Sequence, residues 1–214
     1  MKLQSLQTVF LIPLFTVAFS LCGFSQTVPN PSFEMPGFPD ANPFIILPSG
    51  SGFITGWTVG GAGLDYFKSP PAGAPASDGF YFVDLVRGPG QGGSISTTAT
   101  GLTLGNFYNL TFDIQQGAIE PGTVITAMAD SSTAPFLNTT PNVWATHSLM
   151  FLATASTVPI SFSGPSIGGD DVDVFVDNVR IESILSVPEP GGIAVGILAI
   201  GYLAITHRVR RRQA

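Results

Sequence analysis

The middle of the chain, residues 26–186, carries short runs of apolar and β-branched residues and no helical repeat of apolar positions. Clusters of Gly, Pro, Ser and Asp separate the runs, as turns require. This spacing predicts an all-β domain, an antiparallel β-sandwich, with the Pro-rich stretch 29–48 as a surface excursion before its first strands. The expected strands are FITGWTV (53–59), LDYF (64–67), FYFVDLV (80–86), GSISTTA (93–99), NFYNLTFDI (106–114), TVITAMA (123–129), WATHSLMFLA (144–153), VPISFS (158–163) and VDVFVDNVRI (172–181).

Alternation of apolar and polar residues is clearest in the run 106–114, as expected for a strand with one buried face. Phe107 is out of phase with the later apolar positions Leu110 and Phe112. The change of phase after Tyr108 predicts a β-bulge there. The chain shows no internal repeat and no second domain.

Residues 1–25 have the layout of a secretory signal peptide. Lys2 precedes an apolar run at 9–22, and small residues stand at Gly23 and Ser25. Cleavage is therefore expected after Ser25, which would export the domain.

The single cysteine, Cys22, lies inside this segment, so the mature protein would have no thiol, disulfide or cysteine metal site. A lipid-modified Cys22 is the alternative. Lipoprotein signals place a small residue just before the cysteine, whereas this chain has Leu21.

The carboxyl end, residues 187–214, contains an uncharged apolar segment at 191–206. As a helix it would span roughly 24 Å, a little less than the ~30 Å hydrocarbon core of a bilayer. A cluster of basic residues follows and favours a transmembrane helix with a cytoplasmic tail, whereas a buried terminal helix would leave the cluster without partners. The cluster consists of Arg208, Arg210, Arg211 and Arg212.

The segment before this helix, Val187, Pro188, Glu189 and Pro190, is extended and open to proteases. This motif, the apolar helix and the arginines together resemble the PEP-CTERM sorting signal of Gram-negative bacteria. The resemblance implies an exosortase, a membrane protease or transpeptidase, as partner. It also implies transient anchoring in the inner membrane and delivery to the cell surface or an extracellular, biofilm-type exopolysaccharide matrix.

Charge narrows the partners further. Residues 26–187 contain thirteen acidic residues against Lys68, Arg87 and Arg180. Such an acidic region is a poor partner for nucleic acid, because phosphates would be repelled.

A second resemblance covers about residues 28–184. The landmarks VPNPSFEMP, ITGWTV, LDYF, ASDGFYFVDLV, GGSISTT, FYNLTFDI and VDVFVDNVRI occur in the order found in the choice-of-anchor C family. That family is related to galactose-binding-like jelly rolls, which include plant cell-wall proteins and carbohydrate-binding modules. Pro31 stands where the family usually has glycine, so a loop with positive φ at that position could not be kept.

The same resemblance implies a structural calcium ion held by Glu34 and Asp177, with Asn30 nearby. Asp177 also shares strand parity with Phe175, Val179 and Ile181, which places a carboxylate on an apolar face, where it needs a metal or hydrogen-bond donors. Acceptance of backbone N–H bonds is the alternative role of Asp177. The Asp170, Asp171 and Asp173 cluster is either a further set of ligands or a solvated turn.

Sugar binding would use aromatic rings for stacking and carboxylates for hydroxyl groups, although aromatic residues in a sandwich also fill cores. The candidates are Trp57, Tyr66, Tyr81, Trp144, Asp65 and Asp78.

Catalysis finds little support. His147 lies in a strand-like run without a marked serine and acid, and carboxylates such as Asp84, Asp113 and Glu120 stand in no recognisable motif. The expected function is therefore a non-enzymatic module that binds exopolysaccharide. A structural matrix protein without a small ligand is the alternative, and a polysaccharide hydrolase is a third reading.

Overall fold

The computed structural model describes residues 27–38, 42–69, 75–88, 90–117, 123–166 and 173–184. These residues form two antiparallel sheets, which confirms the predicted all-β fold. Among them no helix is long and apolar enough to cross a membrane. The expected signal peptide, the Val187–Pro190 motif, the 191–206 helix and the arginine cluster lie outside the described residues. The strands are β1 (Phe44–Leu47), β2 (Thr58–Gly61), β3 (Leu64–Lys68), β4 (Tyr81–Asp84), β5 (Gly93–Thr100), β6 (Phe107–Gln116), β7 (Ile125–Ala129), β8 (Ser132–Phe136), β9 (Ala145–Leu152), β10 (Thr157–Ser163) and β11 (Val174–Ser183).

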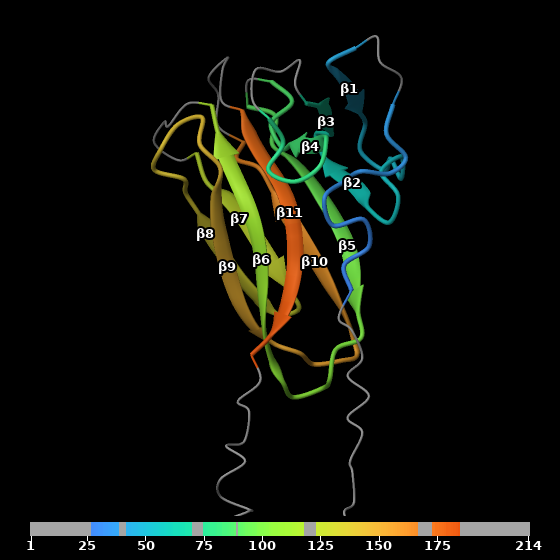
Figure 1. Ribbon diagram of the computed structural model, residues 1–214, viewed down its shortest axis with the longest axis vertical. Coiled ribbons are helices and arrows are strands. Elements are labelled where there is room, and N and C mark those ends of the chain that lie inside the picture. Colours follow the sequence, from blue (N-terminus) through green and yellow to red (C-terminus); the bar gives the residue numbers. More distant parts are fainter. Residues whose placement is uncertain are drawn as a thin grey trace, which may run out of the picture.

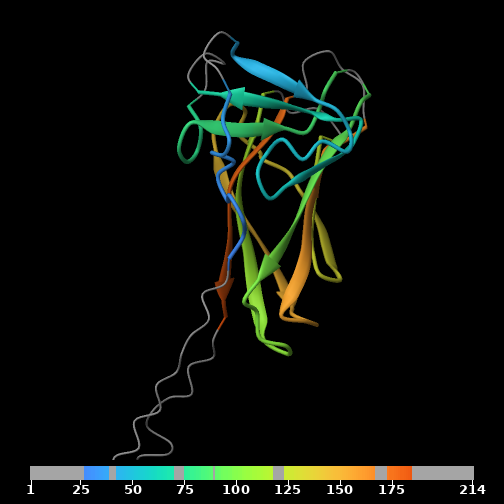
Figure 2. The ribbon, with the colours of Figure 1, turned by 90° about the vertical axis from the view of Figure 1, so that its right-hand side faces the viewer.

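The two sheets pack face to face (Figure 1). One sheet has six strands in the order β1-β3-β4-β11-β6-β9, and the other has five in the order β2-β5-β10-β7-β8. The long strands run along the long axis of the domain, while the short strands β1, β3 and β4 lie across their upper end (Figure 2). We call the end with the β4–β5 connection the upper end, and the end with the β5–β6 connection the lower end.

The core lies between the sheets and is built from the inward-facing residues, which alternate with outward-facing residues along each strand. At its centre, Phe112 on β6 contacts Phe162 on β10 and Phe136 on β8, with ring centroids 4.9 and 5.1 Å apart. These edge-on contacts join the six-stranded sheet to the five-stranded sheet.

Both described ends of the domain lie at the lower end. Thr27 exchanges backbone hydrogen bonds with Thr100 at the end of β5. Ile184 donates its N–H to the carbonyl of Phe107 at the start of β6 (3.0 Å). The chain therefore enters and leaves the sandwich at the end opposite to the β3–β4 and β4–β5 connections.

Eight of the nine predicted runs contain the core of an observed strand, and the ninth, 53–59, holds a strand only at its end. Here the chain makes a turn, in which Trp57 donates its N–H to the carbonyl of Ile54 (2.9 Å) and Gly56 has φ of 81°, and β2 begins at Thr58. Two edge strands, β1 and β8, were not predicted from the sequence. The expected surface excursion 29–48 contains β1, and β8 contains Pro135, which the edge of a sheet tolerates.

The predicted bulge after Tyr108 was wrong. The pairing of β6 with both neighbours is continuous there, with Tyr108 buried on the inner face and Phe107 exposed on the outer face. The irregularity instead lies on β11, where the register shifts between Asp177 and Arg180. The Tyr108 ring is a core residue in spite of its hydroxyl group, so the alternation runs through it without a change of phase.

The contact between the sheets yields a stability prediction. Phe112→Ala should lower the free energy of unfolding by about 3–5 kcal/mol, because it removes a buried ring and leaves a cavity. Phe107→Ala, the same change on the exposed face of the same strand, should cost less than about 1 kcal/mol. Urea unfolding of residues 26–187 measures both, and equal losses would contradict the assigned faces of β6.

Candidate functional site

Residues 75–80, from the connection between β3 and β4, lie on the outer face of the six-stranded sheet. Ser77 donates its hydroxyl to Asp113 Oδ2, and Asp78 donates its N–H to Asp177 Oδ2 (2.9 Å). Trp144 donates its indole N–H to the carbonyl of Pro75 (2.8 Å). We call this segment the 75–80 loop, and its partners come from β6, β11 and the start of β9.

Asp113 and Asp177 stand directly opposite each other on β6 and β11, and both are buried. Asp113 also accepts hydrogen bonds from Thr146 Oγ1 (2.7 Å) and Asn178 Nδ2 (2.9 Å). Asp177 Oδ1 accepts the N–H of Asn178 (2.7 Å). Every carboxylate oxygen of the pair therefore has a donor, as a buried acid requires.

The two carboxyl groups titrate in opposite directions. Burial raises the pKa of Asp177 to about 8, and backbone N–H donors only partly offset it. Burial also raises the pKa of Asp113, but three side-chain hydrogen bonds outweigh it and lower that pKa below its usual value. Of the two groups, Asp177 therefore takes up a proton more readily, and Asp113 stays charged to lower pH.

A β-bulge sets the direction of Asp177. Asn178 has φ of 55°, and the register shifts before Arg180. Asp177 shares the outer face with Phe175, as predicted, but Ile181 returns to the inner face and packs against the core. The predicted common face of Asp177 and Ile181 was therefore wrong, because the bulge breaks the two-residue period.

Glu34 holds the other end of the 75–80 loop. Its Oε1 accepts the N–H groups of Phe80 and Tyr81, both at 2.8 Å. Gly79 has φ of 71°, and a Cβ there would collide with the Glu34 carboxylate, so only glycine fits. Asp78 Oδ2 accepts the Ser32 hydroxyl (2.6 Å), which ties the loop to the segment before Glu34.

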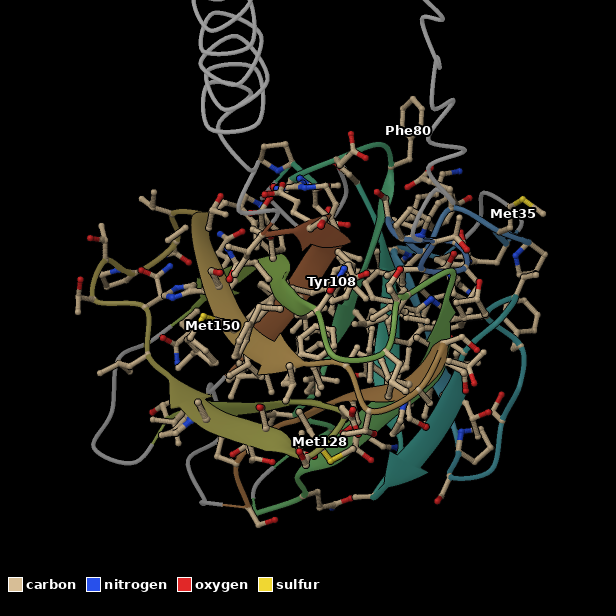
Figure 3. All side chains as sticks on the ribbon, turned by 90° about the horizontal axis from the view of Figure 1, so that it is seen from below. Met35, Phe80, Tyr108, Met128 and Met150 are labelled. Atoms are coloured by element: carbon tan, nitrogen blue, oxygen red, sulfur yellow. The ribbon has the colours of Figure 1, made fainter. Side chains whose placement is uncertain are left out.

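Phe80 is the feature of this loop that the sequence did not single out. Its side chain is 64% exposed and projects from the surface (Figure 3). Among the described residues, Asp78 Oδ1 and Glu34 Oε2 accept no hydrogen bond. The loop thus presents an aromatic ring beside two carboxylate oxygens. The sequence offered one indication: Asp78 and Gly79 are typical turn residues, so Phe80 could have been expected to lie in the turn before the strand.

Two of the four predicted stacking residues belong to the core. Trp57 is 2% exposed and donates its indole N–H to the carbonyls of Pro29 and Asn30, while Tyr66 is fully buried and donates its hydroxyl to Phe33. Their ring faces are therefore closed to a ligand in this structure.

Tyr81 and Trp144, the other two, are half-buried. The Tyr81 ring packs against Tyr66, with centroids 5.2 Å apart. The Trp144 ring packs edge-on against Phe82 (5.8 Å) beside the 75–80 loop. Trp144 is thus the predicted aromatic residue that lies with the loop and still reaches solvent.

The predicted calcium ligands make protein hydrogen bonds. Asn30 Oδ1 accepts the N–H of Met35, and its amide donates to the carbonyls of Met35 and Thr55. Glu34 and Asp177 each receive backbone donors, which is the alternative role stated above for Asp177. In the part of the chain that the structure describes, no three acidic, histidine or cysteine side chains gather as a metal site. Asp170 and Asp171 lie outside that part.

Asp65 lies on the same outer face, directly opposite Asp84 on β4. Asp84 is buried and accepts the N–H groups of Val86 and Val174, both at 3.0 Å. Burial raises the pKa of both carboxyl groups, and the Arg87 charge partly offsets the rise at Asp65. Among the described residues, Asp65 Oδ1 has no hydrogen-bond partner. No hydrogen bond joins Asp65 to the described residues of the 75–80 loop, which carries Asp78.

His147 faces the core between Phe112 and Phe136. Burial lowers its pKa, the nearby Asp113 charge opposes this, and its Nε2 has no partner within the described ranges. It makes no serine–histidine–acid arrangement there.

A family model described as "Protein of unknown function (DUF642)" matches residues 26–182. No curated protein matches the chain.

Several solved structures are similar. TmCBM61, solved in complex with β-1,4-galactotriose, aligns with a TM-score of 0.51 and 17% identity over 73% of this chain and 97% of its own. A family 35 carbohydrate-binding module from Clostridium thermocellum aligns at 0.44 and 13% identity, over 65% and 98%. The CBM22-1 xylan-binding domain of Paenibacillus barcinonensis Xyn10C aligns at 0.41 and 12%, over 69% and 99%. The similarity to TmCBM61 shows that the two domains share a β-sandwich fold.

The buried Asp177 makes stability depend on pH. Its pKa is raised from 3.8 to about 8 in the folded state, so its contribution is fully present below about pH 4 and is lost as the pH rises to about 8. We therefore expect the wild type to lose stability relative to Asp177→Asn across that range.

Urea unfolding at about pH 5 and about pH 8 measures this difference. Asp113→Asn is the matched control, because the pKa of Asp113 is lowered and the group stays charged in both states over this range. Parallel curves for the wild type and Asp177→Asn would show that Asp177 is not protonated in the fold.

Proposed function

We propose that this chain, which belongs to the DUF642 family, is an exported, non-catalytic module that binds polysaccharide through its 75–80 loop. The observation that carries the proposal is the exposed Phe80 ring in a loop with Asp78 and next to Glu34, where one oxygen of each acid accepts no hydrogen bond from the described residues. Sugar rings offer apolar faces that stack on aromatic side chains, and their hydroxyl groups donate to carboxylates. Asp78 and Phe80 both belong to the loop, and Glu34 accepts the backbone N–H of Phe80, so the three residues lie next to one another.

The loop is held in place by carboxylate oxygens that are not available to the ligand. Asp113, Asp177 and Glu34 Oε1 use their hydrogen bonds on the loop itself. A binding surface that is fixed before the ligand arrives loses less conformational entropy on binding. This supports a recognition role for Asp78 and Phe80 and gives the partly exposed Trp144 a place at the edge of the same surface.

The fold and the charge narrow the ligand class. TmCBM61 was solved with a β-1,4-linked galactotriose bound, and that likeness supports a polysaccharide as ligand here only through the shared fold. The acidic residues of the domain outnumber the basic ones, and the binding groups include carboxylates. An uncharged glycan therefore suits this surface better than one rich in uronic acids.

Export and sorting complete the proposal. The signal-like residues 1–25, the Val187–Pro190 motif, the apolar segment 191–206 and the arginines after it support secretion, inner-membrane anchoring and handling by an exosortase. The module would then reach the cell surface or an extracellular matrix and hold polysaccharide there.

Calcium stays a prediction from the resemblance to galactose-binding-like jelly rolls. A calcium ion on Glu34 and Asp177 would compete with the backbone N–H groups that these acids now accept. Sugar binding in calcium and in chelator would show whether an ion contributes.

The proposal predicts that Phe80→Ala weakens binding of residues 26–187 to their polysaccharide by about tenfold or more. The ring is largely exposed, so the variant should fold like the wild type. The assay is calorimetry with the best ligand from a panel of neutral and acidic bacterial exopolysaccharides and β-1,4-galactotriose.

Phe107→Ala is the matched control, since it removes an exposed phenylalanine at the lower end. Its affinity should equal that of the wild type. Binding that is equally strong in both variants would remove the 75–80 loop from recognition, and no binding to any glycan would favour the structural matrix role.

A further inference from the structure

The outer face of the six-stranded sheet becomes apolar at its lower end. Phe107 and Leu152 are register partners on β6 and β9, and Ile184 donates its N–H to the carbonyl of Phe107 from the other side. Met150 precedes Leu152 by two residues on β9 and therefore lies on the same face. These four side chains are 41–59% exposed, and we call them the lower patch.

The lower patch contrasts with the upper part of the same face. There the 75–80 loop covers the outward residues Asp113 and Asp177. At the lower end the outward positions remain open, and Leu104, in the β5–β6 connection at this end, is 68% exposed. A group of exposed apolar residues on one end of a domain is typical of an interaction surface.

The position of Ile184, shortly before the apolar segment 191–206, indicates which partner this surface contacts. Ile184 belongs to the patch, and only residues 185–190 separate it from the apolar segment 191–206. Six residues span at most about 20 Å even when fully extended. The patch is therefore held close to the point where the apolar segment begins.

We propose that the lower patch rests on the surface of the lipid bilayer in which the 191–206 segment is anchored. Phenylalanine, leucine, isoleucine and methionine side chains are suited to the boundary between head groups and acyl chains. Glu182 lies on the same face, and its Oε1 is 4.0 Å from Arg180 Nε, so a positive charge accompanies this carboxylate. The proposal rests on the membrane anchoring put forward under the proposed function.

Contact through the lower patch would fix the orientation of the domain. The 75–80 loop binds Asp113, which is six residues from Phe107 along β6. At about 3.3 Å per residue, the loop stands about 20 Å above the patch. The domain would stand upright on the membrane, with its polysaccharide-binding loop directed outward.

Site-specific fluorescence with the full chain tests this proposal. Cys22 is the single cysteine, so Cys22→Ser gives a background for one introduced cysteine. Leu152→Cys reports on the lower patch, and Phe80→Cys is the matched control on an exposed residue at the upper end. Each variant carries an environment-sensitive dye and is reconstituted into phosphatidylethanolamine–phosphatidylglycerol vesicles, with or without nitroxide-labelled lipid.

We expect a blue shift and strong quenching by nitroxide lipid at position 152, and neither effect at position 80. Loss of the quenching when Phe107→Asp is added would tie the contact to the patch. Vesicle flotation, measured on the same samples, reports anchoring by itself.

The remaining outcomes overturn the proposal in separate ways. Flotation without quenching at position 152 would leave the anchoring intact and contradict the membrane contact. A blue shift without quenching, together with a dimer in sedimentation, would assign the patch to a second copy of the chain. Quenching at both positions would contradict the upright orientation, and failure to float would remove the anchoring as well.

Discussion

The structure depends on two buried carboxylates that face away from the hydrophobic core. Asp113 and Asp177 lie opposite each other on the central strands β6 and β11, where bare charges would be costly. The 75–80 loop crosses over them and supplies one donor to each acid, while Thr146 and Asn178 supply the others. The acids hold the loop in place, and the loop keeps the acids from water.

This mutual requirement links the fold to the proposed recognition surface. The bulge at Asn178 turns a β11 backbone N–H and an amide side chain toward the two acids. Glu34 and Gly79 then fix the direction in which the loop continues into β4. Phe80 is left exposed at the end of a rigid segment, so the parts of the loop that a ligand can reach are its ring and two carboxylate oxygens. The membrane contact inferred at the lower patch would direct this surface outward.

Much of the fold could be predicted because strands with one buried face leave a two-residue period in the sequence. The period fails where the backbone departs from it. At Asn178 a residue of positive φ breaks the parity that was expected to carry from Asp177 to Ile181. The edge strands β1 and β8 bury little, so their sequences carried no clear pattern.

The candidate site was harder to predict, because aromatic residues on both faces look alike in a sequence. Trp57 and Tyr66 fill the core, whereas Phe80 is held outside it by the hydrogen bond that its N–H donates to Glu34, a residue far away in the chain. The acids Glu34 and Asp177 were found from the resemblance and from parity, but their backbone partners depend on how the loop folds back. The sequence does not show that these acids and the N–H groups of the 75–80 loop lie next to each other; the folded structure does.

Recognition by the 75–80 loop is tested most directly by following backbone amide resonances of residues 26–187 by NMR during titration with an oligosaccharide of the polysaccharide that binds best in calorimetry. We expect saturable shifts at Asp78, Gly79 and Phe80, with the amides around Phe107 and Leu152 unchanged. Shifts confined to the lower end, or to the five-stranded sheet, would contradict it, because the acid-held loop would then have no part in recognition.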